Sequence, residues 1–251
     1  MKISVLTVTY NSAATLAHTI DSFLAQTHAD KEMVVVDGAS TDGTLDVVAR
    51  YGGHPIRVVS EPDRGMYDAL NKGLKLFEGD AVGVLNSDDR YHDETALARI
   101  ARGLEEAEAV HGHLDFVEDH EGSRIVRRWR GEERPRSGFR GGWMPAHPTF
   151  YVRRSLAERV GEFDLSLKTA SDYDWMLRAV EGCGATPALV DHVLIDMMQG
   201  GRSTSGLRSH LHHNLEALRA RQRHLGAGAL DYALVAKPAR KIGQFLLRGR
   251  S

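Results

Sequence analysis

The first 106 residues alternate between two hydrophobic periods, and this alternation constrains the fold more than any other feature of the chain. Short continuous apolar runs predict buried strands, and apolar residues at helical spacing predict helices between them. Strands that take turns with helices form a parallel sheet, so we expect an α/β fold. The expected strands are 3–9, 33–36, 56–59 and 81–85, and the expected helices follow Ser12 and cover 44–51, 66–77 and 93–106.

The alternation of strands and helices stops after residue 106, and the pattern predicts a second half with mixed secondary structure. Two extended pieces, 109–117 and 125–129, flank a predicted turn at 119–123. Near the end of the chain, 207–225 and 229–247 show two helical patterns. The sequence therefore predicts an α/β body followed by a helical extension.

Composition is that of an ordinary globular protein, because 42% of the 251 residues are hydrophobic and can form a substantial core. No run approaches the roughly 18 apolar residues that a membrane span needs. The first ten residues lack the pattern of a cleavable leader, so we expect residue 1 to be a true start. Cys183 is the only cysteine, which excludes an internal disulfide and suits a reducing compartment. We therefore expect a cytoplasmic protein.

The net charge of −2 conceals an uneven distribution. Residues 202–251 contain ten Lys or Arg and two acidic residues, a net charge of +8, which leaves −10 on residues 1–201. Within this extension, 237–250 could form a basic amphipathic helix that rests on an anionic membrane surface, at the inner face of the cell membrane. A helix packed against the rest of the chain is an equal alternative.

Acidic residues follow two of the predicted strands. Asp37 follows the second strand, and Asp88 and Asp89 follow the fourth. In open α/β sheets, ligands bind at the edge formed by the carboxyl ends of the strands. The small residues of 38–43 would let a ligand approach the backbone closely. No Lys-containing phosphate loop is present, so we expect a divalent cation, Mn²⁺ or Mg²⁺, held by oxygen ligands from 86–89.

Several segments together resemble the successive signatures of family 2 glycosyltransferases. They are residues 8–11 (VTYN), 34–44 (VVVDGASTDGT), 61–73 (EPDRGMYDALNKG), 86–89 (NSDD) and 171–178 (SDYDWMLR). The resemblance spans residues 3 to about 180 and points particularly to bacterial enzymes of capsule and exopolysaccharide pathways, such as colanic-acid synthesis. It implies a GT-A-type, Rossmann-like nucleotide-binding fold with a mostly parallel central sheet, followed here by a C-terminal helical extension.

The resemblance implies that the chain is an inverting glycosyltransferase of cell-surface polysaccharide synthesis. Such an enzyme moves a sugar from a nucleotide diphosphate-sugar, here expected to be a UDP-sugar, to a hydroxyl of a glycan or lipid-linked glycan. We expect a catalytic domain at 1–201, with a nucleotide-sugar-binding half at 1–106 and an acceptor-side half at 107–201. Residues 202–251 form the basic helical extension in this division.

On the donor side, the matching positions imply one metal ligand and a group of nucleotide-binding residues. Asp88 occupies the last position of the family's aspartate-any-aspartate motif and would bind Mn²⁺ or Mg²⁺. Asn86 replaces the first aspartate of that motif, although its amide can still hydrogen-bond a ribose hydroxyl. The implied nucleotide-binding residues are Thr9, Tyr10, Asp37, Arg64, Asp68 and Asn86.

On the acceptor side, Asp172 matches the aspartate of the family's glutamate-aspartate pair, the general base. Ser171 stands in place of the usual glutamate, and Asp174 lies nearby. Residues two apart on a regular helix point about 200° from one another, so only one of the two aspartates can face the acceptor. His147 is a further acceptor-side candidate, or a structural residue of its loop. Asp172 could also be a simple helix N-cap.

Two other functions remain open from the residues alone. A sugar nucleotidyltransferase also combines an α/β nucleotide fold with Mg²⁺, but Tyr10 is not followed by the Gly-rich basic loop that such an enzyme would show. The second open function is that of a catalytically silent nucleotide-sugar-binding module. The histidines near residue 212 lack the cysteine partners of a structural zinc site. The Arg-rich stretch 124–140 could bind a lipid-linked pyrophosphate, but a solvated hairpin explains it better than nucleic-acid binding does.

Overall fold

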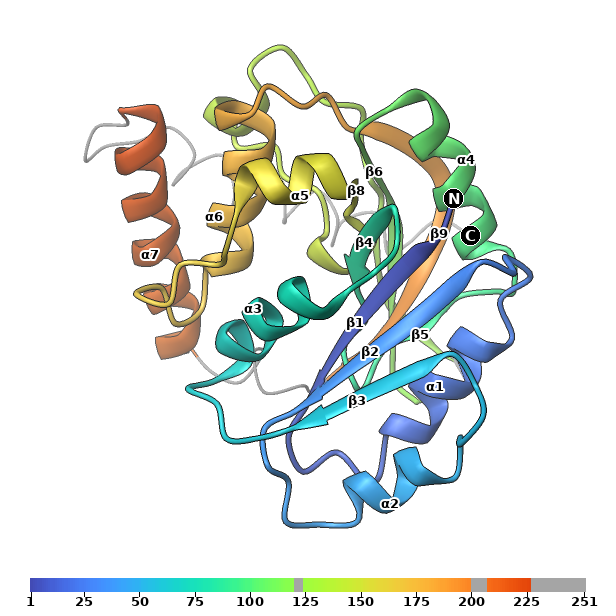
Figure 1. Ribbon diagram of the computed structural model, residues 1–251. Helices are drawn as coiled ribbons and strands as arrows, with labels where there is room; N and C mark the ends of the chain where they lie inside the picture. Colours follow the sequence, from blue (N-terminus) through green and yellow to red (C-terminus); the bar gives the residue numbers. More distant parts are fainter. Residues whose placement is uncertain (120–123, 200–206, 227–251) are drawn as a thin grey trace.

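The computed structural model describes residues 1–119, 124–199 and 207–226 (Figure 1). These residues form one nine-stranded sheet with helices on both faces. The helix predicted at 229–247 and the basic segment 237–250 lie outside the described residues, as does most of the turn predicted at 119–123.

The sheet combines a parallel half with a mixed half. Its strands are β1 Ile3–Thr9, β2 Lys31–Asp37, β3 Ile56–Ser60, β4 Ala81–Val84, β5 Arg90–Tyr91, β6 Ala109–Val117, β7 Ile125–Trp129, β8 Tyr151–Arg153 and β9 Ala188–Met198. They are arranged in the order β3-β2-β1-β4-β8-β6-β9-β5, with β7 paired to β6. Strands β1 to β4 are mutually parallel, which confirms the sequence pattern. Strand β8 is antiparallel to both β4 and β6, so the second half is mixed as predicted.

Helices cover both faces because successive residues of a buried strand point to opposite sides of the sheet. The helices are α1 Leu16–Leu24, α2 Thr44–Ala49, α3 Met66–Leu76, α4 Ala96–Glu106, α5 Arg154–Val160, α6 Ser171–Leu177 and α7 Leu207–Leu225. In β1, Leu6 and Val8 belong to the core beneath α3, α5 and α6, whereas Ile3 and Val5 pack with α1, α2 and α4 (Figure 1). None of the described helices is long and apolar enough to span a bilayer.

Some element limits differ from the sequence patterns for local reasons. The helix predicted from Asp93 begins at Ala96, because the Asp93 carboxylate accepts hydrogen bonds from the amide and hydroxyl of Thr95 and forms a turn there (2.8 and 2.7 Å). Strand β9 occupies a segment in which the pattern predicted no element.

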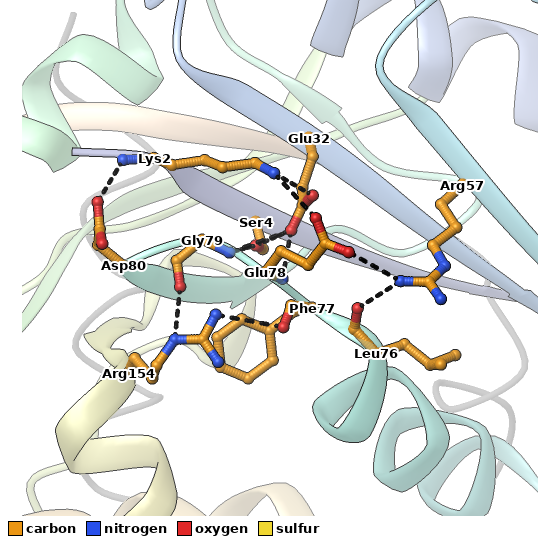
Figure 2. A network of polar contacts seen from close by, with 10 residues as sticks. All are labelled: Lys2, Ser4, Glu32, Arg57, Leu76, Phe77, Glu78, Gly79, Asp80 and Arg154. Carbon is orange, nitrogen blue, oxygen red and sulfur yellow. Dashed lines mark hydrogen bonds and ion pairs between the residues drawn. The ribbon is translucent and has the colours of Figure 1, made fainter.

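The amino-terminal edge of the parallel strands is closed by a polar network around Glu32 (Figure 2). Oε1 of Glu32 accepts hydrogen bonds from the Ser4 hydroxyl (2.5 Å) and from the amides of Glu78 (2.6 Å) and Gly79 (3.1 Å). Oε2 pairs with the Lys2 ammonium at 2.6 Å. A Cβ at Gly79 would lie 2.6 Å from the Lys2 carbonyl oxygen, so only glycine fits where the turn before β4 passes close to the backbone of Lys2. The network therefore joins β1, β2 and the turn before β4.

Helix α7, from the C-terminal extension, packs against α6 and the loop before it. The Glu216 carboxylate accepts hydrogen bonds from the amides of Lys168 (3.0 Å), Thr169 (2.7 Å) and Ala170 (3.1 Å). Burial acts to raise the pKa of Glu216, but the hydrogen bonds from Lys168 and Thr169 outweigh it and lower the pKa. Arg221 donates to the Tyr173 hydroxyl at 3.1 Å, so α7 also contacts α6 directly.

Replacing Glu32 with glutamine should lower the free energy of unfolding at neutral pH by about 1–2 kcal/mol, because Lys2 loses a charged hydrogen-bond partner. Burial acts to raise the pKa of Glu32, but hydrogen bonds from Lys2 and Ser4 outweigh it and lower the pKa. A lowered carboxylate pKa contributes stability that is present above the unfolded value of 4.5 and is lost as the pH falls through the folded value. In urea unfolding, the free energies of unfolding of the wild type and of Glu32→Gln should therefore converge as the pH becomes acidic.

Glu78→Gln is the matched control for this measurement. Glu78 is 66% exposed and pairs with Lys2 and Arg57 at the surface, where an ion pair contributes at most about 1 kcal/mol. A larger loss for Glu78→Gln than for Glu32→Gln, or a Glu32→Gln loss that does not change with pH, would contradict the role of the network.

Candidate active site

The register of the parallel strands brings three polar residues into one row at the carboxyl edge of the sheet. Thr9 at the end of β1 pairs with Asp37 at the end of β2, which in turn pairs with Ser60 at the end of β3. Asp37 is fully buried, and its Oδ2 accepts hydrogen bonds from the Ser40 amide (2.9 Å) and the Ser60 hydroxyl (2.6 Å). Oδ1 accepts from the Ser40 hydroxyl (2.5 Å). This carboxylate therefore ties the loop after β2 to the end of β3.

Two loop residues beside this row have left-handed backbones, which residues other than glycine rarely adopt. Their φ angles are 52° at Asn11 and 61° at Ala39. The Asn11 amide donates to the Ser40 hydroxyl (2.8 Å), and Asn11 Oδ1 accepts from the Thr41 amide (2.9 Å). Such conformations cost about 1–3 kcal/mol, cluster at functional sites and persist only where the surroundings hold them. The hydrogen bonds between the two loops provide that support.

The exposed ring of Tyr10 lies beside Gly38, where the missing side chain lets the Asp63 carboxylate come close to the backbone. Tyr10 is 47% exposed, although it directly follows the buried strand β1. A Cβ at Gly38 would lie 2.5 Å from Asp63 Oδ2 and 3.4 Å from Tyr10 Cδ2. Thr9 is buried beside them, and among the described residues its hydroxyl has no hydrogen-bond partner. The arrangement can accept a flat ring against Tyr10, with polar groups at its edge.

The loop after β4 gives two neighbouring aspartates different surroundings. Asp89 is buried, and its oxygens accept hydrogen bonds from the Asn86 side-chain nitrogen (2.7 Å) and the Met198 amide (3.3 Å). Burial and the neighbouring charge of Asp88 raise the pKa of Asp89 to about 8. Asp88 is only partly buried and is the aspartate of this pair that can reach a ligand. Because the Asn86 nitrogen is engaged within the protein, its oxygen is the atom available for a ribose hydroxyl.

The residues around Asp88 fit a Mg²⁺ or Mn²⁺ ion that is shared with substrate. Within the described part of the chain, no three His, Cys, Asp or Glu side chains converge on a possible metal position. Mg²⁺ is commonly bound by one or two carboxylates, and water and substrate phosphates complete its coordination. Asp88 is partly buried at the strand end and provides such a carboxylate.

Arg64 and Asp68 form an ion pair at the beginning of α3. Arg64 Nη2 lies 2.8 Å from Asp68 Oδ1, and the Arg64 amide donates to Oδ2 at 3.0 Å. The hydrogen bonds from Arg64 lower the pKa of Asp68. The Arg64 side chain is 75% exposed, so Asp68 orients a guanidinium that an anion can still reach. Lys72, in contrast, is engaged with Glu61 at 2.9 Å.

Asp172 lies at the beginning of α6 and meets residues from two other elements. The Tyr67 hydroxyl, from the first turn of α3, donates to Asp172 Oδ1 at 3.1 Å. His147 lies in the short 3₁₀ helix η2 (His147–Thr149); burial lowers its pKa, while the charge of Asp172 acts in the opposite direction. The structure therefore brings the acceptor-side candidates Asp172 and His147 together, beside the donor-side helix α3.

Asp174 points in a different direction, as helical geometry predicted for residues two apart. It is 1% exposed, and its oxygens pair with Arg178 Nε (2.8 Å) and His224 Nε2 (2.9 Å). These contacts give Asp174 a structural role, and they do not support its place among the acceptor-side residues. Ser171, at the position of the family's glutamate, is fully buried. Its hydroxyl has no hydrogen-bond partner among the described residues.

Three residues of this region were not singled out from the sequence as site residues: Ser60, Asp63 and Tyr67. Asp63 and Tyr67 lie within 61–73, the segment that carries part of the resemblance, on either side of Arg64. The signal for Tyr67 was an aromatic residue in the first helical turn that follows a strand end. Its partner Asp172 is 105 residues away in the chain, so no local pattern could connect the two.

The fold and the strand-end polar residues define a nucleotide-binding α/β protein, and comparison with known sequences gives its family. Residues 4–161 match the family model for glycosyl transferase family 2, and the chain belongs to this family. It is 33% identical over 203 residues to a PGL/p-HBAD biosynthesis glycosyltransferase of Mycobacterium bovis, which covers 76% of this chain and 74% of the relative. An uncharacterized glycosyltransferase of Mycobacterium tuberculosis is 31% identical over 216 residues, or 83% of this chain and 77% of the relative.

These matches confirm the resemblance to family 2, and the chain is a glycosyltransferase. Neither relative is named for colanic-acid synthesis, so the predicted subgroup is not confirmed.

Solved structures agree on the fold. S. aureus TarS 1–349 superposes with a TM-score of 0.64 at 22% identity, over 89% of this chain and 72% of that chain. The complex of TarS 1–349 with UDP-GlcNAc superposes with a TM-score of 0.66 at 23% identity, over 87% of this chain and 66% of that chain. The mannosyltransferase PcManGT from Pyrobaculum calidifontis, in complex with GDP-Man and Mn²⁺, superposes with a TM-score of 0.60 at 21% identity, over 95% of this chain and 79% of that chain. The predicted GT-A fold is thereby confirmed.

Proposed function

We propose that this glycosyltransferase moves a sugar from a UDP-sugar to a hydroxyl of a glycan or lipid-linked glycan, with inversion of the anomeric centre. The observation that carries the proposal is the contact between Tyr67 of α3 and Asp172 of α6, because it puts the proposed base beside the helix that begins with the Arg64–Asp68 pair. The name of the M. bovis relative supports a role in cell-surface glycolipid or polysaccharide synthesis. The TarS complex with UDP-GlcNAc supports a UDP-sugar as donor.

On the donor side, the exposed Tyr10 ring would hold the base, and Thr9 would contact the nucleoside edge. Asp37, predicted as a further nucleoside contact, is fully buried and bonded to Ser40 and Ser60, so it would act by holding the loop beside the nucleoside. The Asn86 oxygen would accept from a ribose hydroxyl. Arg64, oriented by Asp68, would contact the diphosphate. A Mn²⁺ or Mg²⁺ ion bound at Asp88 supplies positive charge that stabilises the departing diphosphate.

On the acceptor side, Asp172 would act as the general base. It takes the proton of the acceptor hydroxyl while the acceptor oxygen forms a bond with the anomeric carbon. The bond between that carbon and the diphosphate oxygen breaks, and its electron pair leaves with the nucleoside diphosphate. Attack from the side opposite the leaving group inverts the anomeric centre. A well-placed base of this kind contributes about 10² to 10⁴-fold in rate.

Two alternatives differ from this proposal in a measurable product. Membership of family 2 favours glycosyl transfer over nucleotidyl transfer, which would release pyrophosphate. A catalytically silent nucleotide-sugar-binding module would release nothing, and the replacements Asn86 and Ser171 are the features that favour it. Incubation with Mn²⁺, a panel of UDP-, GDP- and dTDP-sugars and lipid-linked or free glycan acceptors should release nucleoside diphosphate from one donor class.

Replacing Asp88 with alanine should reduce turnover by roughly 10²-fold or more, because several kcal/mol of charge stabilisation depend on the metal ion. Calorimetry should show that Mn²⁺ no longer strengthens UDP binding, while the melting temperature changes little because Asp88 is partly exposed at a strand end. Asp80→Ala is the control, since Asp80 is an exposed carboxylate at the opposite edge, where it accepts from the Lys2 amide. Near-normal turnover of Asp88→Ala in Mn²⁺ would rule out the metal assignment.

Replacing Asp172 with asparagine should lower transfer by roughly 10² to 10⁴-fold, because the amide keeps the shape but cannot accept the proton. Affinities for donor and Mn²⁺ should stay within a few-fold. Asp174→Asn should lower the melting temperature, since Arg178 and His224 lose a buried partner, and should affect turnover much less. The opposite ranking of the two variants, or a loss of donor binding in Asp172→Asn, would show that Asp172 is not the base.

We also propose that the basic segment 237–250 brings the enzyme to an anionic membrane surface, at the inner face of the cell membrane, where a lipid-linked acceptor would lie. Five of its residues are basic and none is acidic, and apolar residues lie between them. Vesicles of phosphatidylglycerol and phosphatidylcholine should sediment the full chain, and high salt should release it. Deletion from Lys237 onward should remove most of this binding; equal binding by the shortened chain would rule the segment out.

A further inference from the structure

We propose that Tyr67 is a positioning residue for glycosyl transfer, whose hydroxyl holds one oxygen of Asp172 so that the other oxygen can face the acceptor. The inference rests on the proposed function, in which Asp172 is the general base. Tyr67 itself touches neither the donor nor the acceptor in this scheme, and acts through the carboxylate.

The contact between the two side chains is suited to this role. Tyr67 is 6% exposed, and its hydroxyl donates to Asp172 Oδ1 at 3.1 Å. Burial and the nearby charge of Asp172 raise the pKa of Tyr67 far above its ordinary value of 10, so the hydroxyl keeps its proton and stays a donor. A carboxylate in the first turn of a helix would otherwise be free to rotate about its side-chain bonds. Anchoring Oδ1 limits that rotation and leaves Oδ2 for the acceptor proton.

The ring of Tyr67 is held by a stack of aromatic side chains. Tyr67 stacks on Phe163 with ring centroids 5.9 Å apart and planes 20° apart, and Phe163 stacks on Trp175 of α6 at 5.4 Å and 17°. Asn71, one turn after Tyr67 on α3, clamps the backbone of Phe163: its Oδ1 accepts from the amide (2.7 Å) and its Nδ2 donates to the carbonyl (3.0 Å). Because these partners come from three parts of the chain, the position of the hydroxyl is fixed by the fold.

The ionisable groups around Asp172 come from three other elements. Tyr67 comes from α3 and His147 from η2, whereas Glu216 and His213 of α7 contact the 168–170 loop that leads into α6. Burial lowers the pKa of His147, which disfavours a positive charge on this ring. The Tyr67 hydroxyl is the donor that anchors Asp172 from α3.

Tyr67→Phe tests the proposal, because it removes the hydroxyl and keeps the stacked ring. We expect kcat to fall by about 5 to 50-fold, as for loss of a hydrogen bond to a charged group, while KM for the donor stays within about twofold. A lower kcat with an unchanged KM for the donor is a split that a purely structural role would not produce. Tyr51→Phe is the matched control, since its hydroxyl donates to the carboxylate of Asp21 in α1 at 2.9 Å; its kcat should stay within about twofold of wild type.

A double-mutant cycle separates this inference from the base assignment. In the Asp172→Asn background, Tyr67→Phe should cause no further loss of nucleoside diphosphate release, and the losses in melting temperature should not add. A multiplied loss of activity or additive melting shifts would overturn the inference. Normal kcat for Tyr67→Phe, with Asp172→Asn impaired, would also overturn it and leave the base assignment standing. Full turnover of Asp172→Asn would contradict both the assignment of Asp172 as the base and the role of Tyr67.

Discussion

The candidate site depends on the backbone pairing of β1, β2 and β3, because this pairing fixes where each strand ends. With Thr9 opposite Asp37 and Asp37 opposite Ser60, a slip of one residue would turn the Asp37 side chain to the other face of the sheet. The bonds of Glu32 to Ser4 of β1 and to Lys2, just before β1, oppose such a slip at the other end of the same strands. The polar network at the amino edge thus helps to set the geometry at the carboxyl edge.

The carboxylates of this region divide into two groups by their burial. Asp37, Asp174 and Glu216 are buried, and each is held by several hydrogen bonds or ion pairs, as a buried charge requires. These three hold loops and helices in place. Asp88 and Asp172 are partly exposed, which suits the metal-binding and general-base roles that we propose for them. This division explains why Asp172 and Asp174, two residues apart, suit such different roles.

The sequence predicted the parallel half of the fold because its strands are short apolar runs; β1, β2 and β4 are largely buried, whereas β3 lies at the edge of the sheet and is largely exposed. It did not predict β9, whose pattern is interrupted by polar residues with distant partners: His192 pairs with Asp93 (2.7 Å), and Asp196 pairs with Arg90 (2.8 Å). Strand-end positions were predictable for the same reason, since they follow from where apolar runs stop. Contacts such as Tyr67 to Asp172 were not, because hydrophobic period carries no information about which distant side chains meet.

Helix α7 lies beyond residue 201, where the charge of the chain changes sign, yet it packs against α6, which carries the proposed general base. Glu216 binds the amides of 168–170 immediately before α6, and His224 pairs with Asp174 in the first turn of α6. Asp172 lies between these two points of attachment. Because a carboxylate that removes a proton must be placed within hydrogen-bond reach of its substrate, the loop and helix around it must be rigid. The catalytic unit that we propose therefore includes α7, and the change in charge at 201 does not mark where packing ends.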